Sequence, residues 1–387
     1  MAKGITVKPI IIQWAIQNSG KSMSLISQKF SKIDEWASTE SELSVNELNK
    51  LSKELRVPFG YFFLKKPPVE DIELLKYRTI DNEEHETPSR ELIDTIKHME
   101  ARQSFMRENL VEDGFLPLNF VGSATTNEEA EELATAILTE LGLTSDWNQK
   151  NPDTFNTLRQ AASNAGILVM QNGVVGNNNY RPLDVAEFRA FVLIDEYAPL
   201  IFLNARDSVK AKIFSLCHEL VHIWLGVNEL YNDPQGENQV FLNEQLEKFC
   251  NETAAEMLLP GNVLREIYDV EMNAYENIKS ISKGFSVSDL VACIRLRQQK
   301  LISKKIFDEV YPTLLEEMRK NLSAKEEMEK SSGGNYYYTQ GSRLDKNFVH
   351  SVSRKAREGK ILYTEAYELL GAKGKTYDKL IEFVEGR

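Results

Sequence analysis

The chain is poor in the residues that hold small secreted domains together. Its 387 residues include three cysteines, which are odd in number and follow no repeated spacing. A disulfide framework is therefore excluded, and we expect reduced, buried thiols at Cys217, Cys250 and Cys293. Histidine is scarce as well, with five in the whole chain, so two that fall four residues apart are conspicuous.

Long apolar runs are also missing. No stretch approaches the roughly 18 apolar residues that a membrane span requires. The most apolar region, residues 191–203, is interrupted by Asp195, Glu196 and Pro199. The first twenty residues lack the long apolar segment and small-residue cleavage site of a signal peptide. We therefore expect a soluble cytoplasmic protein without a membrane partner.

Positive charge is in deficit. The chain carries 46 Lys and Arg against 58 Asp and Glu, a formal net charge of −12, and its sequence pI is about 5.2. A field of that sign opposes non-specific nucleic-acid binding by the whole protein. Residues 1–66 reverse the balance, with ten Lys and Arg against six Asp and Glu, so their net charge is about +4. The net charge therefore permits DNA binding by this segment, in contrast to the chain as a whole.

Composition and helical periodicity divide the chain into five parts. The expected parts are a small helical unit at 1–66, a connector with a long helix at 67–120, a mixed helix and strand region at 121–330, a Ser/Gly-rich linker at 331–342, and a C-terminal region of two short helices at 343–387. Ser44 with Glu47 forms a predicted capping box, and Ser89 is predicted to cap the long helix.

The mixed region predicts a small antiparallel sheet flanked by helices. Amphipathic helices are expected at 128–141 and 153–165, and a strand at 166–171. Two apolar, β-branched runs within 188–203 predict a hairpin. The fold class is therefore α+β and mostly helical.

Residues 217–226, which read CHELVHIWLG, hold two histidines four positions apart. Asp207 or Ser208 is expected to begin the helix that carries them, and Gly226 follows its end. On a helix His218 and His222 share one face, so both imidazoles can reach a single ion. Glu219 is rotated by about 100° from His218, which suits a base that takes a proton from water on the metal. This is the HExxH pattern of zinc peptidases.

A catalytic zinc normally has three protein ligands, so a third is required. A second helix, expected at 243–259, offers four carboxylates: Glu244, Glu247, Glu252 and Glu256. Helical geometry places Glu247, Asn251, Ala254 and Leu258 on one stripe, which favours Glu247 without excluding the others. Asn251 could then bond the outer nitrogen of a ligating histidine. Cys250 and Cys217 are weaker alternatives, because both lie off the relevant faces.

These two helices and the hairpin before them resemble the ImmA/IrrE family of zinc metallopeptidases. The resemblance covers about residues 160–300 and rests on two motifs in order. The matching positions are Phe214, Leu216, His218, Glu219, Leu220 and His222, then Glu247, Asn251, Ala254, Ala255, Leu258 and Pro260. Cys250 stands where the family usually has Ala, and Thr253 where it often has Phe.

The resemblance implies a zincin-like peptidase of the gluzincin type. His218, His222 and Glu247 would hold Zn²⁺, and Glu219 would be the general base and acid. The substrate would be a partner regulatory protein, such as a repressor or a toxin–antitoxin partner. The hairpin at 189–203 would lie beside the cleft, with one edge free to pair with an extended substrate.

The N-terminal stretch SKIDEWASTESELSVNELNKLSKELRVPFGYFF resembles a Cro/repressor-like helix-turn-helix domain of the five-helix type. A recognition helix that reads DNA presents basic or amide side chains. The corresponding stretch, 31–38, offers Lys32 but also Asp34 and Glu35, which repel phosphates. DNA and a protein partner both stay open as targets of residues 1–66.

Two rival interpretations compete with the peptidase. In the first, the protein is a non-proteolytic helix-turn-helix regulator or antitoxin-like binder with a vestigial zinc site. The presence of Glu219 argues against it, because a structural site does not need that carboxylate. In the second, the chain is a metal-free scaffold that carries HExxH by chance. No pattern in the sequence fixes an oligomeric state.

Overall fold

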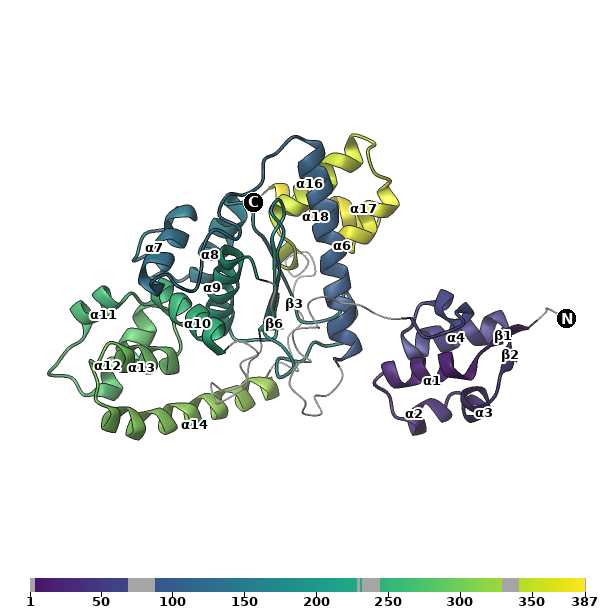
Figure 1. Cartoon of the computed structure of the whole chain (residues 1–387), viewed down its shortest axis with the longest axis horizontal. Coiled ribbons are helices and arrows are strands. Elements are labelled where there is room, and N and C mark those ends of the chain that lie inside the picture. Colours follow the sequence, from purple (N-terminus) through teal and green to yellow (C-terminus); the bar gives the residue numbers. More distant parts are fainter. Residues whose placement is uncertain (1–3, 69–87, 228–229, 232–243, 329–340, 387) are drawn as a thin grey trace. The chain divides into compact units, whose positions relative to one another are not determined.

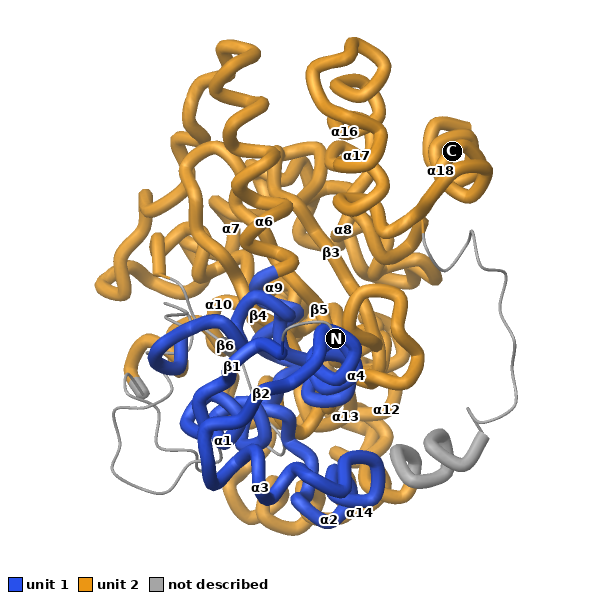
Figure 2. The backbone as a smooth tube through the Cα atoms, turned by 90° about the vertical axis from the view of Figure 1, so that its right-hand side faces the viewer, with its two compact units in different colours: residues 1–97 blue, residues 98–387 orange. Residues whose placement is uncertain are grey.

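The structure is a computed structural model of the chain. It describes residues 4–68, 88–227, 230–231, 244–328 and 341–386. The chain forms two compact units, Met1–Lys97 and His98–Arg387, which we call the N-terminal unit and the large unit (Figure 2). Residues 69–87 of the expected connector and 331–340 of the expected linker lie outside the described residues.

The N-terminal unit is a small helical bundle with a two-stranded sheet. Its elements are β1 (Ile5–Val7), α1 (Pro9–Asn18), α2 (Met23–Ser27), α3 (Ile33–Ser38), β2 (Ser41–Leu43), α4 (Val45–Leu55) and the 3₁₀ helix η1 (Phe59–Phe63). The helices bury a shared apolar core that includes Ile12, Trp36 and Leu48. The antiparallel pair β1–β2 was not predicted, because three-residue strands are too short to show a period.

The predicted capping box at the start of α4 is confirmed. The Ser44 side chain accepts a hydrogen bond from the Glu47 amide (3.2 Å), and the Glu47 carboxylate accepts one from the Ser44 amide (2.8 Å). We expect Ser44→Ala to destabilise α4 by about 1 kcal/mol, since one helix-end amide loses its partner. Hydrogen exchange of the amides in 45–55 measures this. Ser24→Ala on α2, where the side chain is exposed, is the control and should change nothing comparable.

Acid should weaken the same cap. The hydrogen bond from the Ser44 amide, followed by that from its hydroxyl, holds the pKa of Glu47 below its ordinary value of 4.5. A group whose pKa falls on folding stabilises the fold above its unfolded pKa and loses that contribution as pH drops. Protection of the first turn of α4 should therefore be constant above pH 4.5 and decline below it. Equal protection throughout would contradict this assignment.

The large unit is mostly helical. Its helices are α6 (Arg90–Glu112, begun in the N-terminal unit), α7 (Ala130–Glu140), α8 (Thr154–Asn164), α9 (Val209–Leu225), α10 (Glu244–Leu258), α11 (Gly261–Ile267), α12 (Ala274–Gly284), α13 (Asp289–Gln298), α14 (Lys304–Met328), α16 (Lys346–Arg357), α17 (Tyr363–Leu370) and α18 (Lys375–Glu385). The predicted cap holds, since Ser89 accepts from the Leu92 amide at 3.1 Å. Within the described residues, no helix is both long and apolar enough to cross a membrane.

A four-stranded sheet lies among these helices (Figure 1). Its strand order is β3-β5-β4-β6. The strands are β3 (Leu168–Asn172), β4 (Ala190–Leu193), β5 (Leu200–Asn204) and β6 (Leu230–Tyr231). The predicted hairpin is present as antiparallel β4–β5, whereas β3 runs parallel to β5, so the sheet is mixed. Helix α9 packs on β4 and β5. The fold class is α+β and mostly helical, as predicted.

The expectation of a free edge on the hairpin is wrong for the first half of β4 and for the whole of β5. β5 is an inner strand between β3 and β4, and β4 carries β6 on its other side, with Ala190 opposite Tyr231 and Phe191 opposite Leu230. After α9 the chain returns to the sheet, and β6 covers the first two residues of the outer edge of β4. The carbonyl of Leu193, beyond the short β6, accepts a hydrogen bond from Gln103 of α6 (2.7 Å).

The C-terminal region has three helices, α16, α17 and α18, rather than the two predicted. The region is tied to β3 by buried polar side chains. Arg159 donates to the carbonyls of Val169 (3.0 Å) and Leu344 (2.7 Å), and Asp345 accepts from the Val169 amide (3.3 Å). Burial lowers the pKa of Arg159 and raises that of Asp345, so both groups are desolvated while they bond to the backbone. The outer edge of β3 is therefore covered from within the unit.

Candidate metal centre

Helix α9 presents the HExxH residues from a fully packed position. Ser208 begins it by accepting a hydrogen bond from the Ala211 amide (3.2 Å), and Gly226 ends it in the left-handed conformation at φ 69°. The helix is apolar on most of its circumference, which is typical of a core helix. His218, Glu219 and His222 are all 0 % exposed.

Helix α10 packs against α9 and supplies a carboxylate. Glu247 lies in the second turn of α10, where its side chain is buried. Its apolar neighbours on the helix join the same core cluster as those of α9, so the two helices are held at a fixed separation. This contact brings Glu247 to the two imidazoles.

Three metal-binding side chains from these helices converge. The Nε2 atoms of His218 and His222 are 3.1 Å apart, and Glu247 oxygens lie 3.4 Å from the first and 3.3 Å from the second. Among the residues that the structure describes, this is the one group of three or more His, Cys, Asp or Glu residues whose ligand atoms all approach within 4.8 Å.

The spacing fits a tetrahedral ion. Ligands at about 2.0–2.2 Å from one tetrahedral ion lie about 3.3–3.6 Å from one another. The three observed separations fall at or just below that range. Two imidazole nitrogens and one carboxylate also match the ligands that zinc accepts, whereas Ca²⁺ and Mg²⁺ prefer sites made of oxygen alone. The residues therefore fit a small divalent transition metal.

The surroundings prepare the donors for a cation. Asn251 lies one turn after Glu247, and its Oδ1 is 3.1 Å from Nδ1 of His218. An Nδ1–H bond to this oxygen leaves Nε2 of His218 unprotonated and facing the cluster. Burial raises the pKa of Glu247, but imidazoles that are protonated in the absence of a metal lower it more through their charge and hydrogen bonds, so the net pKa falls below the ordinary value. A bound cation, with the imidazoles neutral, acts on the carboxylate in the same direction. The carboxylate is thus ionised, as a metal ligand must be.

The other candidates for the third ligand are engaged elsewhere or lie outside the description. Glu256 accepts from the Gly261 amide (3.0 Å) and pairs with Arg295, while Glu252 is partly exposed beside Lys248. Cys217 and Cys250 are buried in the apolar core, and burial raises the pKa of the Cys217 thiol, which disfavours the thiolate. Glu244 begins α10, and its side chain is not among those described. The structure brings Glu247 to the histidines and leaves the described alternatives apart.

Sequence reasoning did not single out Arg295, which fixes the far end of α10. Its guanidinium donates to the Glu256 carboxylate and to the carbonyl of Leu259 (3.1 Å). Since the partner helix, α13, is some forty residues away along the chain, no local pattern marks this contact. The one available sign was that no acidic residue lies three or four positions from Arg295 on α13, so a partner for its charge had to come from another element.

A metal-capable His, His and Glu cluster with a glutamate beside the first histidine, on two packed helices next to a small sheet, defines a metallopeptidase-type domain. Residues 162–297 match the sequence family described as the IrrE N-terminal-like domain, a peptidase family. This part of the chain is therefore similar to the IrrE N-terminal-like domain, and the family resemblance predicted from the motifs around His218 and Glu247 is confirmed there.

The remaining comparisons concern the rest of the chain. Residues 344–383 match a family described as a domain of unknown function, and these residues span α16, α17 and most of α18. No curated protein matches the chain. The helix-turn-helix resemblance of residues 1–66 thus stays a prediction.

Proposed function

We propose that the large unit is a zinc-dependent endopeptidase. The convergence of His218, His222 and Glu247 at tetrahedral spacing carries the proposal. Glu219 follows His218 on α9, so its carboxylate is supplied by the same rigid element as two of the ligands. A rigid helix is the kind of support that keeps a base and a metal in register.

Bound zinc supplies a positive charge that lowers the pKa of a water molecule and polarises a peptide carbonyl. Glu219 accepts the proton of the attacking water and then delivers it to the leaving amine. Asn251 fixes the ring of His218 through Nδ1. Because Glu219 and both imidazoles are fully buried, a peptide reaches them only after neighbouring side chains move apart.

The substrate we propose is a partner regulatory protein, such as a repressor or a toxin–antitoxin partner. The N-terminal unit supports this, since a separate small helical domain can select a protein for the attached peptidase. Asp34 and Glu35 are exposed on α3, and their charges favour a protein surface over phosphates. DNA binding by residues 1–66 is the second option, supported by their net charge of about +4.

Co-expression of the full chain with the products of neighbouring genes tests this function. We expect one regulatory protein to be cut, with a single new N-terminus found by mass spectrometry. The His218→Ala, His222→Ala double variant should lose both zinc and cleavage. Equal zinc content in the wild type and this double variant would remove the basis of the proposal and favour a metal-free scaffold.

Asn251→Ala should weaken zinc binding by about 10- to 100-fold, because the His218 ring loses its orienting partner. Competition with a chromogenic chelator measures the affinity. Gln245→Ala is the matched control, since Gln245 is exposed on the same helix. Equal zinc affinity in Asn251→Ala and wild type would show that the 3.1 Å contact does not support the site.

A further inference from the structure

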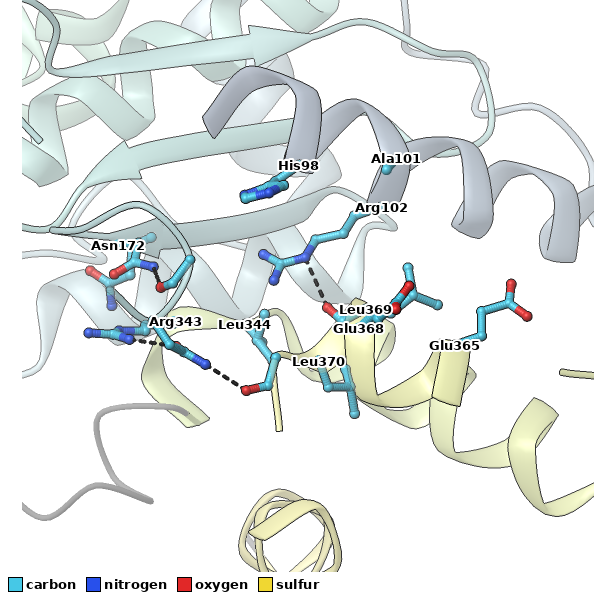
Figure 3. Close-up of a pocket in the computed structure, with 14 residues that line it drawn as sticks. His98, Ala101, Arg102, Asn172, Arg343, Leu344, Glu365, Glu368, Leu369 and Leu370 are labelled. Atoms are coloured by element: carbon cyan, nitrogen blue, oxygen red, sulfur yellow. Dashed lines mark hydrogen bonds between the residues drawn. The ribbon is translucent and has the colours of Figure 1, made fainter. Parts of the chain in front are cut away.

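The large unit contains a hollow that shares no residue with the metal cluster. It has a volume of about 500 Å³ and lies where α6, the end of β3 and α17 meet (Figure 3). The polar residues in its wall include His98, Arg102, Asn177, Arg343, Glu365 and Glu368. Pockets for small molecules typically enclose about 300–1,000 Å³, so this hollow has the size of a ligand site.

Arg102 is the charged group of the inner wall. Its Nε donates to the carbonyl of Leu369 at 3.1 Å, which fixes the guanidinium against the end of α17 (Figure 3). Cζ lies 5.9 Å from the ring centre of Phe348, and Nη1 has only a weak contact with the sulfur of Met99, at 3.9 Å. Nη2 has no hydrogen-bond acceptor within the described chain. One edge of the guanidinium is therefore left to donate into the hollow.

No carboxylate balances this charge in the described part of the structure. Burial alone lowers the pKa of Arg102, to about 10, so the guanidinium is still charged at neutral pH. Arg102 is half-buried. A partly desolvated charge without a counterion costs free energy, and an anion that enters the hollow would recover part of it. Arginine is also the side chain whose fork matches the two oxygens of a carboxylate or phosphate.

The opposite wall is fixed and polar. Arg343 donates to Oδ1 of Asn177 (2.9 Å), and Asn177 donates to the carbonyl of Gly371 (2.6 Å). This chain of bonds holds Arg343 beside the hollow and adds a second positive charge to its wall. Three segments distant in sequence are thus locked around one space.

The rim has the opposite sign. Glu365 and Glu368 lie on α17, and both are exposed. Neither carboxylate has an ion-pair partner within the described ranges. A ligand that spans the hollow would meet a cation inside and two carboxylates outside.

We propose that this hollow binds a small molecule with an anionic group, carboxylate or phosphate, at one end and an ammonium or other hydrogen-bond donor at the other. The anionic end pairs with Arg102, and the donor end faces Glu365 and Glu368. The site does not depend on the proposed peptidase activity. Gln171 lies in the wall of the hollow and accepts a hydrogen bond from Lys212 of α9 (3.0 Å). This bond joins the wall of the hollow to the helix that carries the two histidines.

Four probes separate the two features of the ligand. Ethyl phosphate and phosphoethanolamine differ only by the ammonium group, as do butyrate and 4-aminobutyrate for the carboxylate. Titration calorimetry and thermal unfolding of the full chain measure binding, because a ligand of the folded state raises the unfolding temperature. We expect binding of at least one ammonium-bearing probe, tighter than its partner. Glu365→Gln with Glu368→Gln should remove that advantage.

Arg102→Met should weaken binding by about 10- to 100-fold, the range of one charge-assisted hydrogen-bond pair. Arg107→Met is the matched control, since Arg107 lies on the same helix and pairs with Asp195 outside the pocket. Ala101→Phe fills the hollow while keeping Arg102, so the proposal stays testable if Arg102→Met fails to fold. If only the phosphate probes bind, the anionic group of the ligand is a phosphate, and if only the carboxylate probes bind, it is a carboxylate.

Two results would overturn the proposal. The first is that none of the four probes binds the wild-type chain at millimolar concentration. The second is binding that is equal in wild type, Arg102→Met and Ala101→Phe, because the anion would then lie elsewhere. Equal affinity of the two members of both probe pairs would contradict the role given to Glu365 and Glu368.

Discussion

Replacing Glu219 with Gln should lower the rate of substrate cleavage by about 10²- to 10⁴-fold, the range of general acid–base catalysis. The amide has the same shape as the carboxylate but cannot accept the proton of the attacking water. His218, His222 and Glu247 are unchanged, so the variant should keep its metal. The measurement is the initial rate of cleavage of the co-expressed partner, with metal content determined on the same sample.

Glu252→Gln is the matched control for this substitution. Glu252 lies on α10 only five positions after Glu247, but its side chain is partly exposed and pairs loosely with Lys248 (4.0 Å). Cleavage should proceed at the wild-type rate in this variant. If Glu219→Gln kept both its metal and the full biological effect, the non-proteolytic regulator would be the better interpretation.

The parts of the site that could be predicted from sequence depend on residues close together in the chain. Ser208 and Gly226 mark the ends of α9, and the spacing of His218 and His222 places both imidazoles on one face. Each of these depends on positions within one helix, where the backbone period is fixed. The hairpin β4–β5 was predictable for the same reason, since its strands are adjacent in the chain.

The parts that could not be predicted depend on which elements meet. Residue spacing left several carboxylates open on α10, and only its packing against α9 brings Glu247 to 3.3 Å from His222. The pairing of β6 with β4 covers part of an edge that was expected to be free. No sequence pattern distinguishes Arg102 from other polar residues of its long helix, because its contact with α17 comes from a distant segment. Such contacts are set by the three-dimensional arrangement and carry no period along the chain.

Arg295→Met should cost about 3–5 kcal/mol of the free energy of unfolding of the large unit, because it leaves the buried carboxylate of Glu256 without its partner. Arg295 also donates to the carbonyl of Leu259 (3.1 Å), while Glu256 accepts from the Gly261 amide (3.0 Å). These bonds join the end of α10 to α13. Urea unfolding of the metal-free full chain, followed by tryptophan fluorescence, measures the loss.

The matched control is Arg297→Met, the same substitution two positions further along α13. Arg297 is half-buried and has no ion-pair partner in the described chain, so its replacement should stay within about 0.5 kcal/mol. Adding Glu256→Gln to Arg295→Met should recover part of the loss, since the unpaired charge is then gone. If Arg295→Met and Arg297→Met unfolded at the same urea concentration, the pair would not anchor α10. The position of Glu247 would then depend on the apolar contact between α9 and α10 alone.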